Sequence, residues 1–305
     1  MDFEQCLRGS RRILMEGALG ERLKGAFGLT PDPDIALAAT IDAPAGREAL
    51  AALWGEYIAI AKAHGLPLLT ATPTRRANRE RVARAGRDAS VLRDNATFLR
   101  AIQAASGIEM YAGGLMGCKG DAYTGQGALS AAQARAFHRW QAEALAGAGL
   151  DYLYAGIMPT LPEALGMAQA MGDTGLPYII SFTIQKDGRL IDGTAVDAAI
   201  GAIDEGTARP PVCYMTNCVH PDIALQALEQ PFNRTERVRA RFWGIQANAS
   251  PLPYDQLDGA ANPRNAPPGQ LAEAMIRLRD AAGLRILGGC CGTDGTYMEA
   301  IARRM

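Results

Sequence analysis

The stretch R-I-L-G-G-C-C-G-T-D-G-T-Y-M-E-A-I-A-R-R, residues 285–304, predicts a strand, a glycine-rich turn and a helix in succession. Its apolar run at 285–287 suits one short buried strand, and residues 296–304 have the spacing of the helix that follows. A strand that leads through a turn into a helix is the repeating unit of α/β proteins. The same order of elements recurs throughout the sequence that precedes it.

Eight such units account for the chain. Strands are predicted at 12–15, 66–71, 110–115, 152–155, 178–183, 212–217, 242–247 and 285–287, and helices at 47–64, 89–106, 130–147, 162–171, 194–205, 222–229, 269–281 and 296–304. Eight units favour a closed (β/α)8 TIM barrel over a doubly wound open sheet, and no G-x-G-x-x-G follows the first strand. We expect residues 1–305 to form a single domain, with a long loop at 251–268 after the seventh strand.

Charge and hydropathy limit the classes of partner. The 31 Lys and Arg against 32 Asp and Glu give a net charge of −1, which argues against nucleic acid as a partner and favours small molecules. No segment approaches the roughly 20 apolar residues that cross a bilayer, and the N-terminus does not resemble a secretory signal. We therefore expect a cytoplasmic protein that does not bind membranes and keeps its thiols reduced. The sequence leaves open whether it forms a homo-oligomer.

Three of the six cysteines end predicted strands. Cys218 follows the sixth strand, and Cys290 and Cys291 follow the eighth, so a barrel would bring all three to its functional face. Three thiolates suit Zn²⁺ and leave a fourth position open, which is typical of a catalytic site. The glycines on both sides of the adjacent pair allow the bend that both side chains need. The alternatives are a buried pair of small apolar residues and a redox switch formed by the two neighbouring thiols.

Six segments resemble the homocysteine S-methyltransferase family, which includes the betaine–homocysteine and S-methylmethionine–homocysteine methyltransferases. They are G-G-C-C-G-T at 288–293, N-C-V-H-P at 217–221, M-E-G-A-L-G-E-R-L at 15–23, T-A-T-P-T-R-R-A-N-R-E-R-V at 70–82, I-S-F-T-I-Q-K-D-G-R-L-I-D-G-T at 180–194 and N-A-S-P-L-P-Y-D at 248–255. The resemblance implies a (β/α)8 barrel that holds zinc through Cys218, Cys290 and Cys291. It also implies methyl transfer from a sulfonium or quaternary ammonium donor to a zinc-bound thiol, with homocysteine converted to methionine.

The chain departs from the family where the substrate's amino group is expected. The family usually has Glu-Thr at the end of strand four, and its Glu is associated with that amino group, but the two positions here are Gly156 and Ile157. The usual Asp at strand one is Glu16, which would either bind an ammonium group or orient its own loop. These differences leave two alternatives to homocysteine methylation. One is methylation of a different small thiol, and the other is a non-catalytic protein that binds zinc or a thiol.

Further residues are predicted to border the substrates. Asn217 precedes the first cysteine of the site and Asn248 follows the seventh strand, so both are candidates for substrate contact together with Glu16 and position 156. Tyr123 would face a cationic donor through cation–π attraction. His220 is expected to act within its loop rather than to bind the metal.

Overall fold

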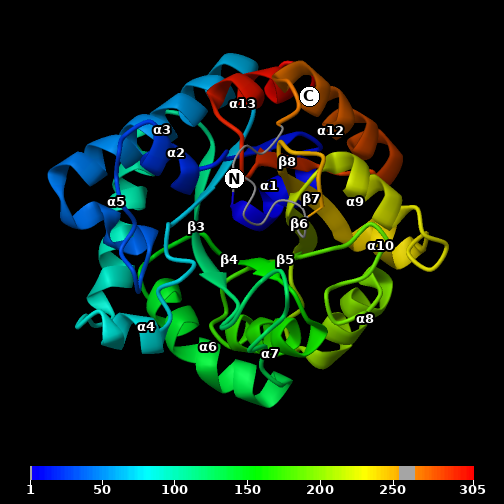
Figure 1. The fold of residues 1–305 in the computed structure, drawn as a ribbon, viewed down its shortest axis with the longest axis horizontal. Helices are drawn as coiled ribbons and strands as arrows, with labels where there is room; N and C mark the ends of the chain where they lie inside the picture. The colour runs from blue at the N-terminus through cyan, green and yellow to red at the C-terminus, as the bar shows by residue number, and fades with distance from the viewer. Residues whose placement is uncertain (1, 254–264) are drawn as a thin grey trace.

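The computed structural model describes residues 2–253 and 265–305. In these residues eight parallel strands close into a barrel in chain order, and β8 pairs with β1 (Figure 1). The strands are β1 (Ile13–Met15), β2 (Leu68–Ala71), β3 (Met110–Gly117), β4 (Tyr152–Met158), β5 (Tyr178–Phe182), β6 (Cys213–Val219), β7 (Phe242–Ala247) and β8 (Ile286–Gly289). All eight predicted strands and the closed (β/α)8 barrel are confirmed.

Helices surround the barrel and connect its strands (Figure 1). The predicted helices correspond to α3 (Pro44–His64), α5 (Ser90–Ala105), α6 (Ala131–Ala146), α7 (Leu161–Gly172), α8 (Val196–Gly206), α9 (Pro221–Leu228), α12 (Pro268–Ala282) and α13 (Gly295–Ala302). The sequence did not predict α1 (Phe3–Gly9), α2 (Gly20–Gly25), the 3-10 helix η1 (Leu37–Asp42), α4 (Arg79–Arg84) or α10 (Glu236–Arg241). Among the described helices, none has the length and apolar character needed to cross a membrane.

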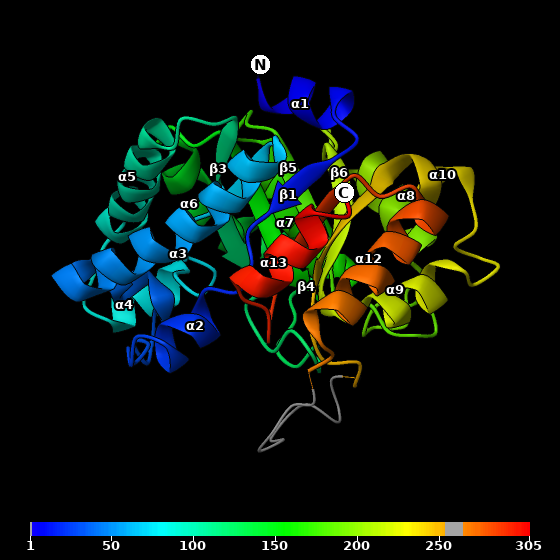
Figure 2. The same cartoon turned by 90° about the horizontal axis from the view of Figure 1, so that it is seen from above.

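The strands are buried on both faces, which explains their nearly continuous apolar sequences. Side chains alternate, so that Ile13 and Met15 belong to the cluster inside the barrel while Leu14 packs against the surrounding helices. The helix α1 covers one end of the barrel (Figure 2), where Phe3 stacks on Tyr152 with ring centroids 4.3 Å apart. Access to the barrel axis is therefore left at the other end, where the strands terminate.

Part of the predicted loop at 251–268 falls outside the described residues. This holds for residues 254–264, and thus for the last two residues of the motif at 248–255. At the near side of the gap, Asn248 Oδ1 accepts a hydrogen bond of 2.9 Å from Ser250 N. At the far side, Ala266 N donates to the carbonyl of Ala249 over 2.8 Å, so both flanking segments lie against the end of β7.

Candidate metal centre at the barrel mouth

Three thiol groups meet at the end of the barrel where the strands terminate. Cys218 is the second-last residue of β6, and Cys290 and Cys291 directly follow β8. The sulfur atoms of Cys218 and Cys291 lie 3.4 Å apart, and those of Cys290 and Cys291 lie 4.0 Å apart. All three sulfur atoms are within 4.8 Å of one another. The structure thus brings together the three cysteines that the sequence places at strand ends.

The spacing of the sulfur atoms fits a tetrahedral metal ion. With zinc–sulfur bonds of about 2.3 Å, two sulfur ligands of one tetrahedral ion lie about 3.8 Å apart. The observed distances of 3.4 and 4.0 Å lie on either side of that value. Thiolates are soft donors, which favours zinc over Mg²⁺ or Ca²⁺. The residues present therefore fit a zinc ion that keeps a fourth position for a substrate.

The turn after β8 is shaped so that two adjacent cysteines reach the site. The Thr293 hydroxyl donates to the carbonyl of Cys290 over 2.7 Å, and Ala249 N donates to the carbonyl of Cys291 over 3.0 Å. Gly289 is required here, because a Cβ atom at this position would lie 2.3 Å from Thr293 Oγ1. One of the glycines expected to allow the bend, Gly289, thus lets the Thr293 hydroxyl lie close to the backbone.

Two residues at the mouth adopt backbone conformations that are unusual outside glycine. Ile157 has φ 60° and Cys218 has φ 62°. They lie at irregularities in the pairing of β4 with β5 and of β6 with β7. A left-handed backbone costs on the order of 1–3 kcal/mol for such residues and persists only where the surroundings hold it. Strained residues and bulges of this kind concentrate at functional sites.

The three thiols do not ionise equally. Hydrogen bonding with the Cys290 and Cys291 thiols holds the pKa of Cys218 well below its ordinary value. The same interaction with Cys218 raises the pKa of Cys290 and of Cys291. Cys218 is also the most deeply buried of the three thiols, with 2% of its surface exposed.

Two of the predicted substrate contacts lie directly against this sulfur. The Tyr123 hydroxyl donates to Cys218 Sγ over 3.3 Å, and Asn248 Nδ2 lies 3.7 Å from the same atom. Burial, followed by the nearby Cys218, raises the pKa of Tyr123, so its hydroxyl stays protonated and remains a donor. Both residues help to stabilise negative charge on Cys218, while their contact with a substrate stays a prediction.

The Asn217 side chain has hydrogen-bond partners on two other strands. Its side-chain oxygen accepts hydrogen bonds from Ile157 N over 3.0 Å and from the Ser181 hydroxyl over 2.7 Å. Ser181 lies in the motif at 180–194, but nothing in the sequence marks it as a residue of the site. Its partner could not be predicted, because the contact depends on how three strands are aligned across the barrel.

Two further residues, His220 and Cys118, lie beside the three thiols rather than among them. His220 is the N-cap of α9, where its Nδ1 accepts from Asp222 N over 3.3 Å. Cys118 packs against a small buried cluster, defined by Ala122, Ile157 and Cys218, which the other two cysteines of the site also contact. Burial raises the pKa of Cys118 to about 12, so it remains a neutral thiol at physiological pH.

Glu16 is buried with both carboxylate oxygens engaged. Trp54 Nε1 donates to one oxygen over 2.7 Å and Ala71 N donates to the other over 3.1 Å. Trp54 belongs to α3, so the side chain extends from the end of β1 toward the surrounding helices. This arrangement matches the second role considered from the sequence, the orientation of neighbouring segments. Its binding of a substrate ammonium group stays a prediction.

The titration of Glu16 predicts how stability depends on pH. Burial raises its pKa from 4.5 to about 8, against the opposing effect of the two hydrogen bonds. Between these pH values the folded chain retains a proton that the unfolded chain releases, so the free energy of unfolding falls as pH rises. The expected loss from pH 5 to pH 8 is on the order of a few kcal/mol.

Urea unfolding at both pH values, with EDTA and a reductant present, measures this loss without a contribution from metal binding. The variant Glu16→Gln should show a clearly smaller loss, because its side chain does not titrate. An equal loss in both proteins would contradict the assigned pKa.

Position 156 has no polar side chain to offer a substrate. A Cβ atom built on Gly156 would lie 2.9 Å from Leu115 Cδ1, and Leu115 itself packs against the apolar interior of the barrel. Leu115 therefore occupies the space into which a longer side chain from position 156 would extend. The lack of a side chain at Gly156 thus leaves room for Leu115, while contact of Gly156 with a substrate stays a prediction.

A cavity of about 340 Å³ opens beside Cys218. Its described lining combines apolar and polar surface and consists of Tyr123, Ile184, Gln185, Lys186, Ile191, Cys218, Val219, Ile223, Leu252 and Pro253. Lys186 is the only charged residue in this lining. The cavity has room for a small organic molecule next to the thiols, and it presents a cation, rather than a carboxylate, to that molecule.

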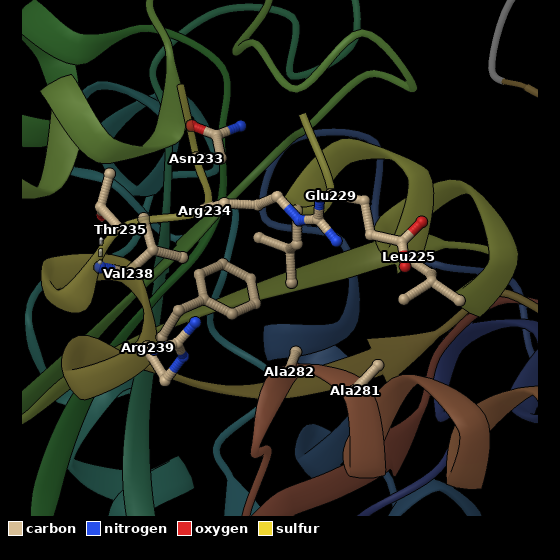
Figure 3. Close-up of a pocket in the computed structure, with 11 residues that line it drawn as sticks. Leu225, Glu229, Asn233, Arg234, Thr235, Val238, Arg239, Ala281 and Ala282 are labelled. Atoms are coloured by element: carbon tan, nitrogen blue, oxygen red, sulfur yellow. Dashed lines mark hydrogen bonds between the residues drawn. The ribbon is translucent and has the colours of Figure 1, made fainter. Parts of the chain in front are cut away.

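A second cavity, of about 150 Å³, lies between α9, α10 and the C-terminal end of α12 (Figure 3). Its walls include Phe242, the first residue of β7, whereas Cys218 lies near the last residue of β6 and Cys290 and Cys291 follow the last residue of β8. It is therefore at the opposite end of the barrel from the three cysteines and takes no part in their chemistry.

The fold and the site together define a (β/α)8 barrel with three thiols at the ends of its strands, suited to a catalytic metal. The family model described as "Homocysteine S-methyltransferase" matches residues 13–305. The chain belongs to the homocysteine S-methyltransferase family.

Individual relatives agree with this assignment. The homocysteine S-methyltransferase of Escherichia coli is 27% identical over 189 residues, which cover 61% of this chain and 57% of the relative. The methionine synthase of Mycobacterium leprae is 28% identical over 145 residues, 45% of this chain and 11% of the relative. The chain thus spans less than two thirds of either curated relative.

Solved structures show the same fold. The metallated form of the Escherichia coli homocysteine methyltransferase MmuM superposes with a TM-score of 0.77 at 22% identity, and the match covers 98% of both chains. The apo form of the same protein gives a TM-score of 0.69 at 21% identity, again over 98% of both chains.

Proposed function

We propose that residues 1–305 act as one domain with zinc-dependent S-methyltransferase activity. The enzyme would move a methyl group from a sulfonium or quaternary ammonium donor to a small thiol, with homocysteine the acceptor that the family suggests. The observation that carries this proposal is the group of three cysteine sulfur atoms within 4.8 Å at the barrel mouth. A cytoplasmic location is part of the same proposal.

Cys218, Cys290 and Cys291 would hold the ion. When bound, zinc would lower the pKa of the acceptor thiol, which is otherwise mostly protonated at neutral pH. In the reaction the acceptor sulfur forms a bond to the methyl carbon while the bond from that carbon to the onium sulfur or nitrogen breaks. The electron pair leaves with the donor, which becomes neutral, and the proton of the acceptor thiol is released to solvent.

The chain's own residues would position the two substrates. The cavity beside Cys218 offers the space, and its apolar side chains would limit the access of water to the reacting atoms. Tyr123 is the aromatic side chain of this lining, so its ring is placed to attract the positive charge of the donor.

A second candidate is the methylation of a thiol that lacks an α-amino group. Three observations favour it: Leu115 fills the space beside Gly156, both oxygens of Glu16 are already engaged, and Lys186 is available to a substrate carboxylate. The first two remove a partner for a substrate ammonium group, and the third supplies a partner for a substrate carboxylate.

Acceptor selectivity decides between the two candidates. We expect 3-mercaptopropionate and homocysteine to be methylated with kcat/KM values within about tenfold of each other, because sites without a polar partner discriminate weakly. The measurement is a methyl-transfer assay with a sulfonium donor and each thiol in turn. A preference for homocysteine above about a hundredfold, as expected from a buried ion pair, would contradict the second candidate.

A matched variant tests the structural reason. Leu115→Ala combined with Gly156→Glu places a carboxylate in the space that Leu115 now fills, and it should raise the preference for homocysteine. If wild-type protein binds zinc but no combination of donor and thiol reacts, the non-catalytic reading gains support.

A further inference from the structure

We infer that Asn217 is a positioning residue that fixes the conformation of Cys218 by holding the backbone of Ile157, with Ser181 orienting its side chain. The inference rests on the proposed use of the three thiols as metal ligands. It assigns Asn217 a role that differs from the substrate contact considered above, and it adds Ser181 and Ile157 to the residues on which the metal site depends.

The hydrogen bonds join three neighbouring strands, β4, β5 and β6. Ser181 lies in β5, and Asn217 in β6 accepts from its hydroxyl over 2.7 Å. The same oxygen of Asn217 accepts from Ile157 N in β4 over 3.0 Å. The side chain of Asn217 therefore reaches past β5 and links its own strand, β6, to β4. Ser181 has no exposed surface and Asn217 has 5%, so water does not compete for these bonds.

The backbone departs from regular strand geometry at Ile157, which donates to Asn217, and at Cys218, which directly follows Asn217. Ile157 and Cys218 both have positive φ angles, and each lies at a pairing irregularity of its strand. A branched side chain such as that of Ile157 avoids this conformation unless its surroundings impose it. The hydrogen bond from Ile157 N to Asn217 is one such constraint, and packing in the buried cluster that contains Cys218 is another.

Cys218 is the residue immediately after Asn217, so the direction of its thiol depends on the same segment. With the Asn217 side chain fixed between β4 and β5, the left-handed turn at Cys218 directs its sulfur to within 3.4 Å of Cys291. Loss of the Asn217 contacts would release Ile157 toward an extended backbone and widen the distribution of sulfur positions. Residues that orient metal ligands typically change metal affinity by 10- to 100-fold when they are replaced.

Zinc affinity, measured by competition with a chromophoric chelator, tests the inference without relying on enzyme activity. We expect Asn217→Ala to weaken zinc binding by about 10- to 100-fold, and Ser181→Ala to weaken it less, because the bond to Ile157 remains. Thr183→Val is the matched control. Thr183 lies just beyond β5, and its buried hydroxyl has no hydrogen-bond partner among the described residues, so its removal should leave zinc affinity unchanged. Urea unfolding of the metal-free proteins checks that every variant folds.

A double-mutant cycle separates positioning from a general structural effect. Glycine adopts positive φ without strain, so Ile157→Gly removes the need for Asn217 to hold this backbone. We expect Asn217→Ala to cost clearly less zinc affinity in the Ile157→Gly background than in the wild type. An equal cost in both backgrounds, or unchanged affinity in both Asn217→Ala and Ser181→Ala, would overturn the inference while leaving the metal site intact. A wild-type chain that binds no zinc would overturn the metal site and this role of Asn217 together.

Discussion

Replacement of Cys218 by alanine is expected to reduce the rate of methyl transfer by at least about 10³-fold, because a bound metal contributes several kcal/mol to such a reaction. Cys218 is the thiol with the lowered pKa, and its sulfur lies within reach of Cys291, Tyr123 and Asn248. Its loss would remove one of the three proposed metal ligands. The measurement is the initial rate of product formation with saturating donor and thiol.

Cys213→Ala provides the matched control for this experiment. Cys213 is the first residue of β6, is fully buried, and lies in the apolar interior of the barrel away from the mouth. Its replacement should leave the rate of methyl transfer nearly unchanged. A Cys218→Ala protein that retains more than about a tenth of the wild-type rate would show that methyl transfer does not depend on a metal ion bound there.

Glu163→Ala is expected to lower the free energy of unfolding by about 3–5 kcal/mol, the largest loss that we predict for a single side chain. Glu163 has no exposed surface. Its carboxylate accepts from Lys119 N over 2.7 Å, from His138 Nε2 over 3.0 Å and from Leu129 N over 3.4 Å. Without it, two backbone N–H groups and a buried imidazole lose their acceptor.

The same substitution connects stability to the site. Lys119 and Leu129 flank the loop that carries Tyr123, so the loop is tied to α7 through Glu163. The measurement is urea unfolding, with Glu143→Ala as a control, because among the described residues the Glu143 side chain makes only an exposed pair with Arg139. A similar midpoint for Glu163→Ala and Glu143→Ala would contradict the role assigned to Glu163.

The regular part of the fold could be predicted because parallel strands buried on both faces have distinctive sequences. The predicted seventh strand matches β7 at both ends, residues 242–247. The fourth and sixth strands extend beyond the predicted ends to Met158 and Val219, since the bulges there continue the pairing past residues that do not alternate. Helices as short as α4 or α10 have too few residues to show a helical period.

The sequence predicts those parts of the site that depend only on where the strands end. Cys218, Cys290 and Cys291 follow strands that converge in any barrel of this type, so their approach needs no knowledge of side-chain direction. The direction of Glu16 does need that knowledge. Alternation along β1 puts Glu16 on the same face as Leu14, toward the helices, and this signal was present in the sequence. The contacts of Asn217 depend on the register of three strands, which no local pattern specifies.

The zinc content of the purified protein tests the central claim most directly. Elemental analysis by inductively coupled plasma mass spectrometry, after purification under reducing conditions, is expected to find close to one zinc ion per wild-type chain and almost none in Cys291→Ala. A wild-type protein without zinc, or a Cys291→Ala protein that retains as much zinc as the wild type, would contradict the assignment of the three cysteines as a catalytic zinc site.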